Sequence, residues 1–236
     1  MQANLYAMAI EAERLKSIPY FSGLGSSELQ AIGRLVFERS ADRNELIVLE
    51  GGPADAVYFV VSGAVKAFKT SAEGKEQILC IIRPGESFND VPVFDGGSNP
   101  ASAVAMSQVT LYGISKADME ALLREHPNIA INIIRVLAER VRHFVSMVED
   151  LSFRHVTGRV AKLLLEYATN HRATGEETGA RPRLTQQDMA AMVGTAREVV
   201  GRSLKALEEE GAIRMDRHRI VIADKEILKE ISGVAV

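Results

Sequence analysis

An unbroken heptad pattern in the second half of the chain limits the fold more than any other feature of the sequence. Apolar residues recur there at spacings of four and three, which places them on one face of a long α-helix. They are Ala130, Ile134, Leu137, Val141, Phe144, Val148 and Leu151. The segment 128–151 corresponds to roughly 36 Å of helix at a rise of about 1.5 Å per residue. A rod of that length separates the part of the chain before it from the part after it.

A second apolar row, formed by Ile129, Ile133 and Val136, lies beside the heptad positions. Two apolar rows on one helix fit one row packed on the chain's own N-terminal part and one row that meets a partner. We therefore predict a parallel homodimer, and a buried core helix is the alternative. The predicted dimer seam consists of Leu137, Val141, Phe144, Val148 and Leu151.

Before the rod, the sequence is typical of an antiparallel β-roll. Short β-prone runs alternate with turn signals between about residues 38 and 114, and such a texture indicates a barrel or roll. The runs are LIVLE, AVYFVV, AVKAFK, QILCII and VTLYGI. The turn signals are Gly51-Gly52-Pro53, Ser62-Gly63, Glu73-Gly74, Pro84-Gly85 and Gly96-Gly97. Helical patterning covers about 5–35 and 118–125 on either side.

After the rod, the stretch TQQDMAAMVGTAREVVGRSLKAL (185–207) predicts two short helices joined at a glycine. Thr185 can cap the first helix, with Asp188 as its capping-box partner. Gly194 stands where the turn needs a positive φ. Thr195 is expected to be the N-cap of the second helix.

The second of these helices is expected to turn a polar face outward. Its apolar residues, between Val199 and Leu207, face the core, which leaves Arg197, Glu198 and Arg202 on the outer side. A helix-turn-helix presents side chains to the major groove of DNA in this way. We predict a DNA-binding surface made of these side chains and the two caps, and an ordinary helical hairpin is the alternative. Its residues are Thr185, Thr195, Arg197, Glu198 and Arg202.

A β-wing follows, because AIRMDRHRIVIA (212–223) predicts two short strands on either side of 216–219. The segment 181–219 carries eight Lys and Arg against six Asp and Glu, whereas the whole chain has a net charge of −3. A local positive bias in an acidic chain suits contact with phosphates and does not suit indiscriminate coating of nucleic acid.

The fold class is therefore α+β, with an N-terminal β-roll (jelly roll), a long dimerisation helix and a C-terminal winged helix-turn-helix. The expected domains are residues 1–127, 128–153 and 154–236, within the size range of ordinary domains. Glu11 and Glu13 interrupt the only apolar stretch near the start, and no run approaches a membrane span. We expect a cytoplasmic protein without a membrane partner. One cysteine, Cys80, excludes an internal disulfide.

Two other functional classes find little support. A metal enzyme of the cupin type needs histidines from the strands, and the first histidine of the sequence is His126. No P-loop or Ser/His/Asp pattern is present either, so neither an enzyme nor a metal site is expected. A regulatory subunit that acts through protein contact would leave the Arg197, Glu198 and Arg202 face without a purpose.

The order of roll, long helix and winged helix-turn-helix resembles the cAMP receptor protein/FNR superfamily of bacterial regulators. The resemblance implies that the roll is a cyclic-nucleotide-binding-type β-roll. The resemblance covers nearly the whole chain and is carried by EGGPADAVYFVVSGAVK, PGESF, VTGRVAKLLL and VGTAREVVGRSLKALEEEGAI. Members with an Arg-Glu-x-x-x-Arg recognition helix read TGTGA-type half-sites, and Arg197, Glu198 and Arg202 match that pattern. Arginine can bond guanine O6 and N7, and glutamate can accept from cytosine N4. Ser203 stands where an apolar residue is more usual.

The same resemblance implies a palindromic operator in double-stranded DNA, RNA polymerase as a partner, and allosteric control. A signal in the roll would alter its packing on the dimer helices and extend or rotate them near 150–153. The two reading helices would then be re-aimed to match the DNA.

The resemblance also places an effector pocket, and here the sequence departs from the family. The ribose-binding pair falls at Asn89 and Asp90, and the phosphate-binding Arg-Ser pair falls at Pro100 and Ala101. Without the arginine, a buried phosphate lacks its charged partner. Asp90, without a nearby cation, would repel the phosphate. cAMP is therefore not the expected effector. A cAMP-responsive regulator, in which Asp90 holds a ribose hydroxyl, is kept as an alternative.

An apolar pocket is expected instead, because the two positions that would face adenine are Phe144 and Val145. Its other residues are Phe88, Val91, Val93 and Val148. The NPASAV segment resembles haem-linked, nitric-oxide-responsive members of the superfamily. Carbon-monoxide-sensing members use a Cys and a His where this chain has Asn89 and Val91. Haem held by His126 or His143, and a core that needs no ligand, are both left open, so the cofactor is unknown.

Overall fold

The computed structural model describes residues 14–173, 184–216 and 219–233. It divides into two compact units, Met1–Lys69 with Leu79–Arg142, and Thr70–Ile78 with His143–Val236. Part of the predicted first helix, residues 5–13, and the segment 174–183 before the predicted helix-turn-helix lie outside the described residues. The domain boundaries expected from the sequence stay a prediction, because the two units divide within the long helix.

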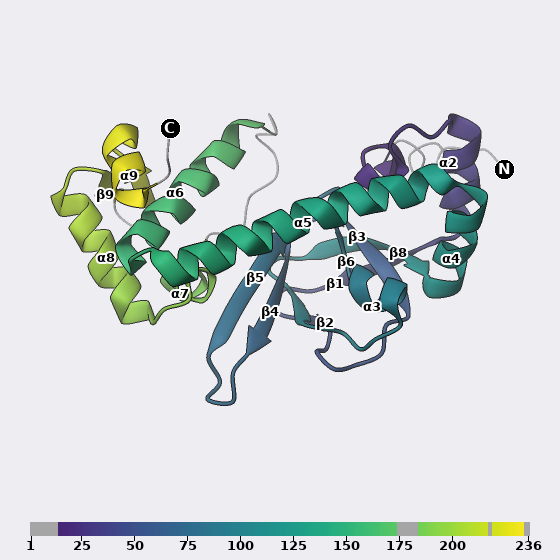
Figure 1. Ribbon diagram of the computed structural model, residues 1–236, viewed down its shortest axis with the longest axis horizontal. Coiled ribbons are helices and arrows are strands. Elements are labelled where there is room, and N and C mark those ends of the chain that lie inside the picture. The colour runs from purple at the N-terminus through teal and green to yellow at the C-terminus, as the bar shows by residue number, and fades with distance from the viewer. Residues whose placement is uncertain (1–13, 174–183, 217–218, 234–236) are drawn as a thin grey trace. The chain divides into compact units, whose positions relative to one another are not determined.

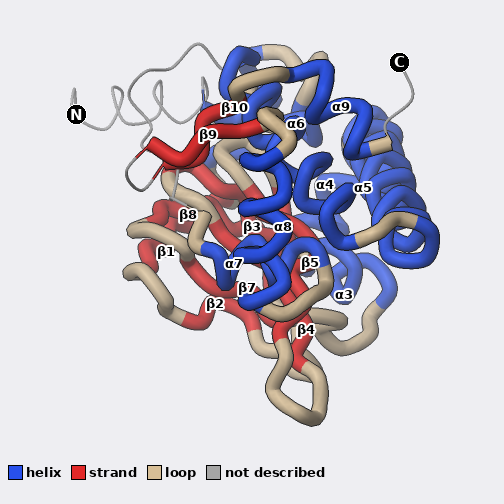
Figure 2. The backbone as a smooth tube through the Cα atoms, turned by 90° about the vertical axis from the view of Figure 1, so that its left-hand side faces the viewer, coloured by secondary structure: helices blue, strands red, loops and turns tan. Residues whose placement is uncertain are grey.

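The first unit contains the predicted β-roll, built from two antiparallel four-stranded sheets (Figure 2, red). One sheet has the order β1 (Val36–Ala41), β8 (Val109–Ser115), β3 (Ala56–Ser62) and β6 (Ser87–Phe88). The other has the order β2 (Leu46–Val48), β7 (Ser102–Ala105), β4 (Val65–Thr70) and β5 (Glu76–Ile82). The five β-prone runs of the sequence became β2, β3, β4, β5 and β8, whereas β1, β6 and β7 had no separate signal.

Strand β3 lies at the centre of the unit because both of its faces are buried. Tyr58 and Val60 belong to the core that draws residues from both sheets. Val57 and Phe59 belong to a second core, which the helices of the unit cover. Alternate side chains of a strand point to opposite faces, so one strand supplies both cores.

The turns between these strands contain the predicted glycines. Gly51, Gly63, Gly74, Gly85 and Gly96 all have φ between +75° and +88°. At Gly63 close packing adds to this requirement, because a Cβ there would lie 2.3 Å from the Gln108 carbonyl oxygen. That position accepts no other residue without a shift of the backbone.

Helices cover one side of the roll. They are the 3₁₀ turn η1 (Pro19–Phe21), α2 (Ser26–Gly33), α3 (Asp90–Asp95), α4 (Lys116–Glu125) and the start of α5 (Pro127–Phe153). Helix α4 starts two residues before the predicted 118–125, since the Ser115 hydroxyl accepts from the Asp118 N–H at 3.1 Å and caps it. The predicted inward row of α5 is confirmed, because Ile129 and Ile133 are buried in the helix-covered core and Val136 packs against it.

The second unit holds the helices that follow α5, drawn from green to yellow in Figure 1. They are α6 (Val156–Ala173), α7 (Gln186–Val193), α8 (Arg197–Glu209) and α9 (Lys225–Ser232), with β9 (Ile213–Asp216) paired antiparallel to β10 (Arg219–Ile222). Their core includes Val160, Val200, Leu204, Leu207 and Leu228. Among the described residues, no helix combines the length and apolar character that a bilayer crossing needs.

Candidate nucleic-acid interface

Helix α7 is fixed at its start by the capping box that the sequence predicts. The Thr185 hydroxyl accepts from the Asp188 N–H at 3.1 Å, and the Asp188 carboxylate accepts from the Thr185 N–H at 2.9 Å. Two amides that would otherwise lack a partner are thereby satisfied. The side chain of Thr185 lies at the surface, so the cap also defines one edge of the candidate interface.

The turn between α7 and α8 follows the prediction at Gly194 but not at Thr195. Gly194 has φ +69°, and its N–H donates to the Ala190 carbonyl. The Thr195 N–H donates to the same carbonyl at 2.9 Å, so Thr195 completes the end of α7. The expected Thr195 N-cap was wrong, because α8 begins one residue later with Ala196 as its N-cap and no side-chain cap bond.

Helix α8 has one buried face and one exposed face. Val200, Leu204 and Leu207 are at most 4% exposed, and they hold the helix in the core of its unit. Arg197, Glu198 and Arg202 are exposed, and none of them makes a hydrogen bond or ion pair with any residue that the structure describes. The three predicted base-reading side chains therefore share a surface and are free to meet an external partner.

Ser203, the departure noted in the sequence, is buried and satisfied. It is 4% exposed, and its hydroxyl accepts a hydrogen bond from the Thr157 hydroxyl of α6 at 3.2 Å. A buried hydroxyl without a partner would destabilise the unit. The substitution of a serine for an apolar residue is thus compensated from the neighbouring helix.

The predicted wing is present beside α8. Arg219 pairs with Asp216, and Val221 pairs with Arg214, across β9 and β10. Arg214 and Arg219 are both exposed, which adds positive charge to the surface of the unit. The tip at 217–218 lies outside the described residues.

The heptad row of α5 is largely exposed in the single chain. Ile134, Val141 and Val148 are 60–65% exposed, and Phe144 and Leu151 are 39% and 41% exposed. Leu137 differs from the rest of the predicted seam, because it is partly buried against the helix-covered core of the first unit. A contiguous set of large apolar side chains exposed to water is typical of an interaction surface.

In the β-roll, Asp90 is the centre of a buried polar network. Tyr20 donates its hydroxyl proton to one carboxylate oxygen, and Arg140 of α5 donates to the other. The same guanidinium donates to the Ser87 carbonyl and, at 2.8 Å, to the Ser87 hydroxyl. The Asp90 side chain is only 1% exposed. The expectation that Asp90 lacks a nearby cation was wrong, because Arg140 supplies one.

Burial and charge in this network shift the pKa values of Tyr20 and Arg140. Burial and the charge of Asp90 both raise the pKa of Tyr20, so its hydroxyl keeps its proton and donates it to Asp90. Burial alone would lower the pKa of Arg140, but the charge of Asp90 and its hydrogen bond raise it on balance. The Arg140 guanidinium therefore keeps its charge, and its hydrogen bonds are made within the protein.

The other predicted effector residues differ from Asp90 in burial and in their partners. Phe88 is buried in the core that both sheets share, whereas Val91 is 46% exposed. The Asn89 amide donates to the Ala56 carbonyl at 2.8 Å. Pro100 is exposed and Ala101 is half-buried, and neither brings a charge. Phe144 and Val145 belong to the second unit and are exposed.

Two basic residues of the first unit, Lys69 and His126, already have polar partners. Lys69 donates to the Pro100 carbonyl at 3.1 Å and pairs with Glu50 at 2.6 Å. His126 lies 3.2 Å from a carboxylate oxygen of Glu28. Within the described part of the chain, no three His, Cys, Asp or Glu side chains are grouped so as to hold a metal ion.

Comparison with known proteins matches both parts of the chain. Residues 38–126 match the cyclic nucleotide-binding domain, and residues 158–231 match the Crp-like helix-turn-helix domain. The "CRP-like cAMP-activated global transcriptional regulator" of Mycobacterium tuberculosis is 31% identical over 212 residues, 88% of this chain and 93% of that protein. The "Cyclic AMP receptor protein" of Thermus thermophilus is 32% identical, over 92% of this chain and 98% of that protein.

The chain belongs to the Crp/Fnr family. It is a Crp-like DNA-binding transcription regulator. Among solved structures, FixK2 from Bradyrhizobium japonicum superposes with a TM-score of 0.72 at 26% identity, covering 85% of this chain and 99% of that one.

In this Crp/Fnr regulator, the residues that the sequence failed to single out are Tyr20 and Arg140. They lie 70 and 50 residues from Asp90, so no local pattern connects them to it. One signal was available. Arg140 stands seven residues after Ile133, on the inward row of α5, and a charge on an inward row needs a buried partner.

Proposed function

We propose that this Crp/Fnr regulator acts as a homodimer that reads a palindromic TGTGA-like operator and responds to a signal received by the β-roll. One observation carries the proposal: Arg197, Glu198 and Arg202 are exposed, and have no polar partner among the described residues, on a helix whose opposite face is buried. Guanidinium groups of this kind can bond guanine O6 and N7, and a carboxylate can accept from cytosine N4. Thr185 and Thr195 flank these side chains.

The exposed row of α5 supports the dimer. Val141, Phe144 and Val148 keep a helical face apolar where water would favour polar side chains. A second copy on that face would bury it and set two α8 helices about one turn of DNA apart, which suits a palindrome. A signal in the roll would change its packing on α5 and so re-aim the pair of reading helices.

Gel-shift titration with a TGTGA-N6-TCACA duplex and a scrambled duplex of equal length tests this function. We expect the palindrome to be bound in strong preference. Equal affinity for both duplexes would overturn the proposed specificity. The Val141→Glu, Phe144→Glu double variant should run as a monomer on a sizing column and lose the palindrome, and a dimeric variant would show that the seam lies elsewhere.

The effector that we propose is not cAMP, although relatives carry cAMP in their names. The phosphate of a cyclic nucleotide needs a charged donor, and Pro100 and Ala101 offer none. The carboxylate that would meet a ribose is 1% exposed and is held by Tyr20 and Arg140. Thermal unfolding with and without millimolar cAMP should give the same midpoint. A saturable rise in the midpoint would contradict this assignment.

A further inference from the structure

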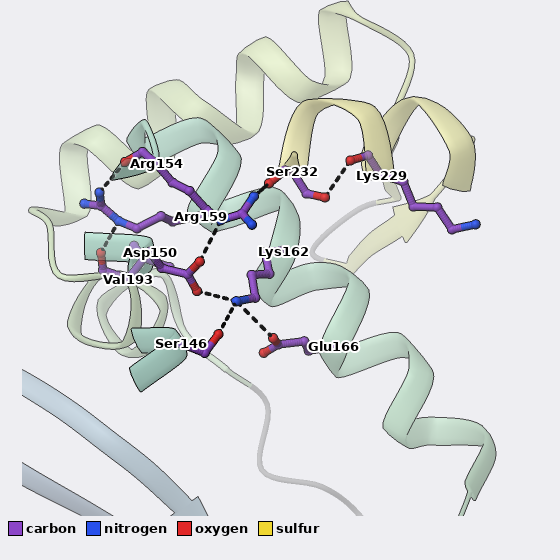
Figure 3. A network of polar contacts seen from close by, with 9 residues as sticks. All are labelled: Ser146, Asp150, Arg154, Arg159, Lys162, Glu166, Val193, Lys229 and Ser232. Atoms are coloured by element: carbon purple, nitrogen blue, oxygen red, sulfur yellow. Dashed lines mark hydrogen bonds and ion pairs between the residues drawn. The ribbon is translucent and has the colours of Figure 1, made fainter. Parts of the chain in front are cut away.

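The end of helix α5 is joined to the DNA-binding helices by a polar cluster that the proposed function has not used (Figure 3). Helix α5 ends at Phe153 and α6 begins at Val156, so only Arg154 and His155 lie between them. Because the connection is so short, the angle between α5 and α6 depends on the side-chain contacts around it. Those contacts come from α5, α6, α7 and α9 (Figure 3).

Asp150 is the anion that holds the cluster together. Its two carboxylate oxygens lie 2.7 Å from the Arg154 Nε and 2.5 Å from the Lys162 Nζ. Lys162 also donates to the Ser146 hydroxyl at 3.0 Å and lies 4.0 Å from Glu166. The side chains of Asp150, Arg154 and Lys162 are only 17–21% exposed, so water screens these interactions less than it screens surface pairs.

Arg159 extends the cluster to the helix-turn-helix. Its guanidinium donates to the Arg154 carbonyl at 2.7 Å and to the Val193 carbonyl at 2.8 Å. Val193 is the last residue of α7, directly before the Gly194 turn that leads into α8. Because the guanidinium is planar and rigid, one side chain fixes the junction after α5 relative to the turn before α8.

Packing brings the same two elements together. A Cβ built on Gly194 would lie 2.7 Å from the Leu151 Cδ2, so the last turn of α5 touches the turn of the helix-turn-helix. On the other side, Arg154 donates to the Ser232 carbonyl at the end of α9. Apolar contact and charged hydrogen bonds therefore act at one place.

We propose that Asp150, Lys162 and Arg159 are positioning residues that set the direction of α8 relative to α5, and so the half-site spacing that a dimer accepts. This inference rests on the proposed function. None of the three side chains lies on the exposed face of α8. The unit has its own apolar core, so loss of the cluster releases the α5 end without unfolding the helix-turn-helix.

The test compares Lys162→Met with Lys162→Arg and with the control Lys229→Met. The control removes an ion pair of similar length between two side chains of α9, Lys229–Glu226 at 2.8 Å, and leaves the Lys229 carbonyl that accepts from Ser232 in place. Affinity is measured for the full palindrome and for a duplex with one half-site. We expect Lys162→Met to lose about tenfold in affinity for the palindrome and about twofold or less for the half-site. Lys162→Arg should retain most of the affinity, and Lys229→Met should match the wild type.

A second set of duplexes measures spacing directly, with spacers one or two bases shorter and longer. The wild type should prefer one spacing, and Lys162→Met and Asp150→Asn should bind the set more evenly. Equal losses on palindrome and half-site, or an unchanged spacing preference, would overturn the positioning role.

Hydrogen exchange without DNA separates this inference from the proposed function. Amides in 150–160 should exchange faster in Lys162→Met than in wild type, while those in 200–207 stay protected. If the wild type fails to select the palindrome, the proposed function fails and the exchange result still decides whether the cluster holds the junction. Unchanged exchange in 150–160 would show that the cluster does not hold the junction, and would overturn the positioning role.

Discussion

Arg140 of helix α5 and the two arginines of helix α8 put the same side chain to opposite uses. Arg140 donates to Asp90 and Ser87, and its carboxylate partner is almost fully buried. Arg197 and Arg202 are exposed and make no polar contact with a described residue. An arginine that is committed within its own chain stabilises the fold. One whose five donors stay in water is available to an external partner at little cost in folding energy.

Removal of Asp90 should produce the largest effect, because Asp90 is the buried partner of Arg140, the arginine that is committed within the chain. Asp90→Ala removes the carboxylate that accepts from Arg140 and Tyr20, and leaves Arg140 with only the neutral acceptors of Ser87. We expect the free energy of unfolding of the first unit to fall by about 2–4 kcal/mol, since a buried charge is left uncompensated. Scanning calorimetry of the full chain measures the change in the transition of that unit.

Two controls accompany this variant. Asp90→Asn keeps an acceptor and should lose less. Glu120→Ala removes an exposed partner of Arg124 and should change stability by only about 0.5 kcal/mol or less. An Asp90→Ala transition within the range of the Glu120→Ala transition would show that the network contributes little.

Removal of an exposed arginine of α8 should have the reverse effect, which is a loss of DNA affinity without a loss of stability. Arg202→Ala takes away no contact with a described residue, so the unfolding transition should stay where it is. Affinity for the palindrome should fall by about 1–3 kcal/mol, with relaxed base choice at one position of each half-site. Fluorescence anisotropy with operators substituted at single positions measures both changes. An equal loss on palindromic and random DNA would assign Arg202 to phosphate contact instead.

Local features of this fold could be predicted from the sequence, and long-range pairings could not. The capping box of Thr185 and Asp188, the positive φ at Gly194 and the inward row of α5 depend on neighbours within a few residues. Each has a signature in composition or periodicity. The architecture followed from these signatures together with the strand texture and the family resemblance.

The effector region was harder because its contacts join distant segments. Asp90 meets a tyrosine 70 residues before it and an arginine 50 residues after it. A sequence places neither beside the carboxylate, so Asp90 looked like an isolated charge. The Thr157 partner of Ser203 was hidden for the same reason. The predicted Thr195 cap failed on a smaller scale, since the end of α7 used one residue more than expected.

Two threonines at the helix-turn-helix, Thr185 and Thr195, differ in the same way as the arginines do. The Thr185 hydroxyl caps α7, whereas the Thr195 side chain makes no hydrogen bond with a described residue. Thr185→Ala should destabilise the second unit by about 1 kcal/mol. Thr195→Ala should leave its transition unchanged. Chemical denaturation followed by circular dichroism measures both, and a larger loss for Thr195→Ala would restore Thr195 as the structurally important cap.

The smallest effect is expected at Cys80, which reports on the charge of Arg140. Burial raises the pKa of the Cys80 thiol to about 11. The positive charge of Arg140 lowers this pKa, and the negative charges of Glu86 and Asp90 raise it. At pH 8 about one thiol in a thousand is then ionised, and the thiolate is the form that alkylates. A raised pKa favours the folded state below the unfolded pKa of the thiol, and this contribution is lost as the pH rises toward 11.

Iodoacetamide should therefore react slowly with the native chain and faster after unfolding in urea, as mass spectrometry would show. Asp90→Ala removes one charge that raises the pKa of Cys80 and leaves Arg140 unbalanced, so alkylation of the folded variant at pH 9 should be faster than that of wild type. The variant must be folded at the assay temperature, which its calorimetric transition establishes. If both proteins react at the same rate, the positive charge of Arg140 does not reach Cys80. The comparison with the free arginines of α8 would then rest on hydrogen bonding alone.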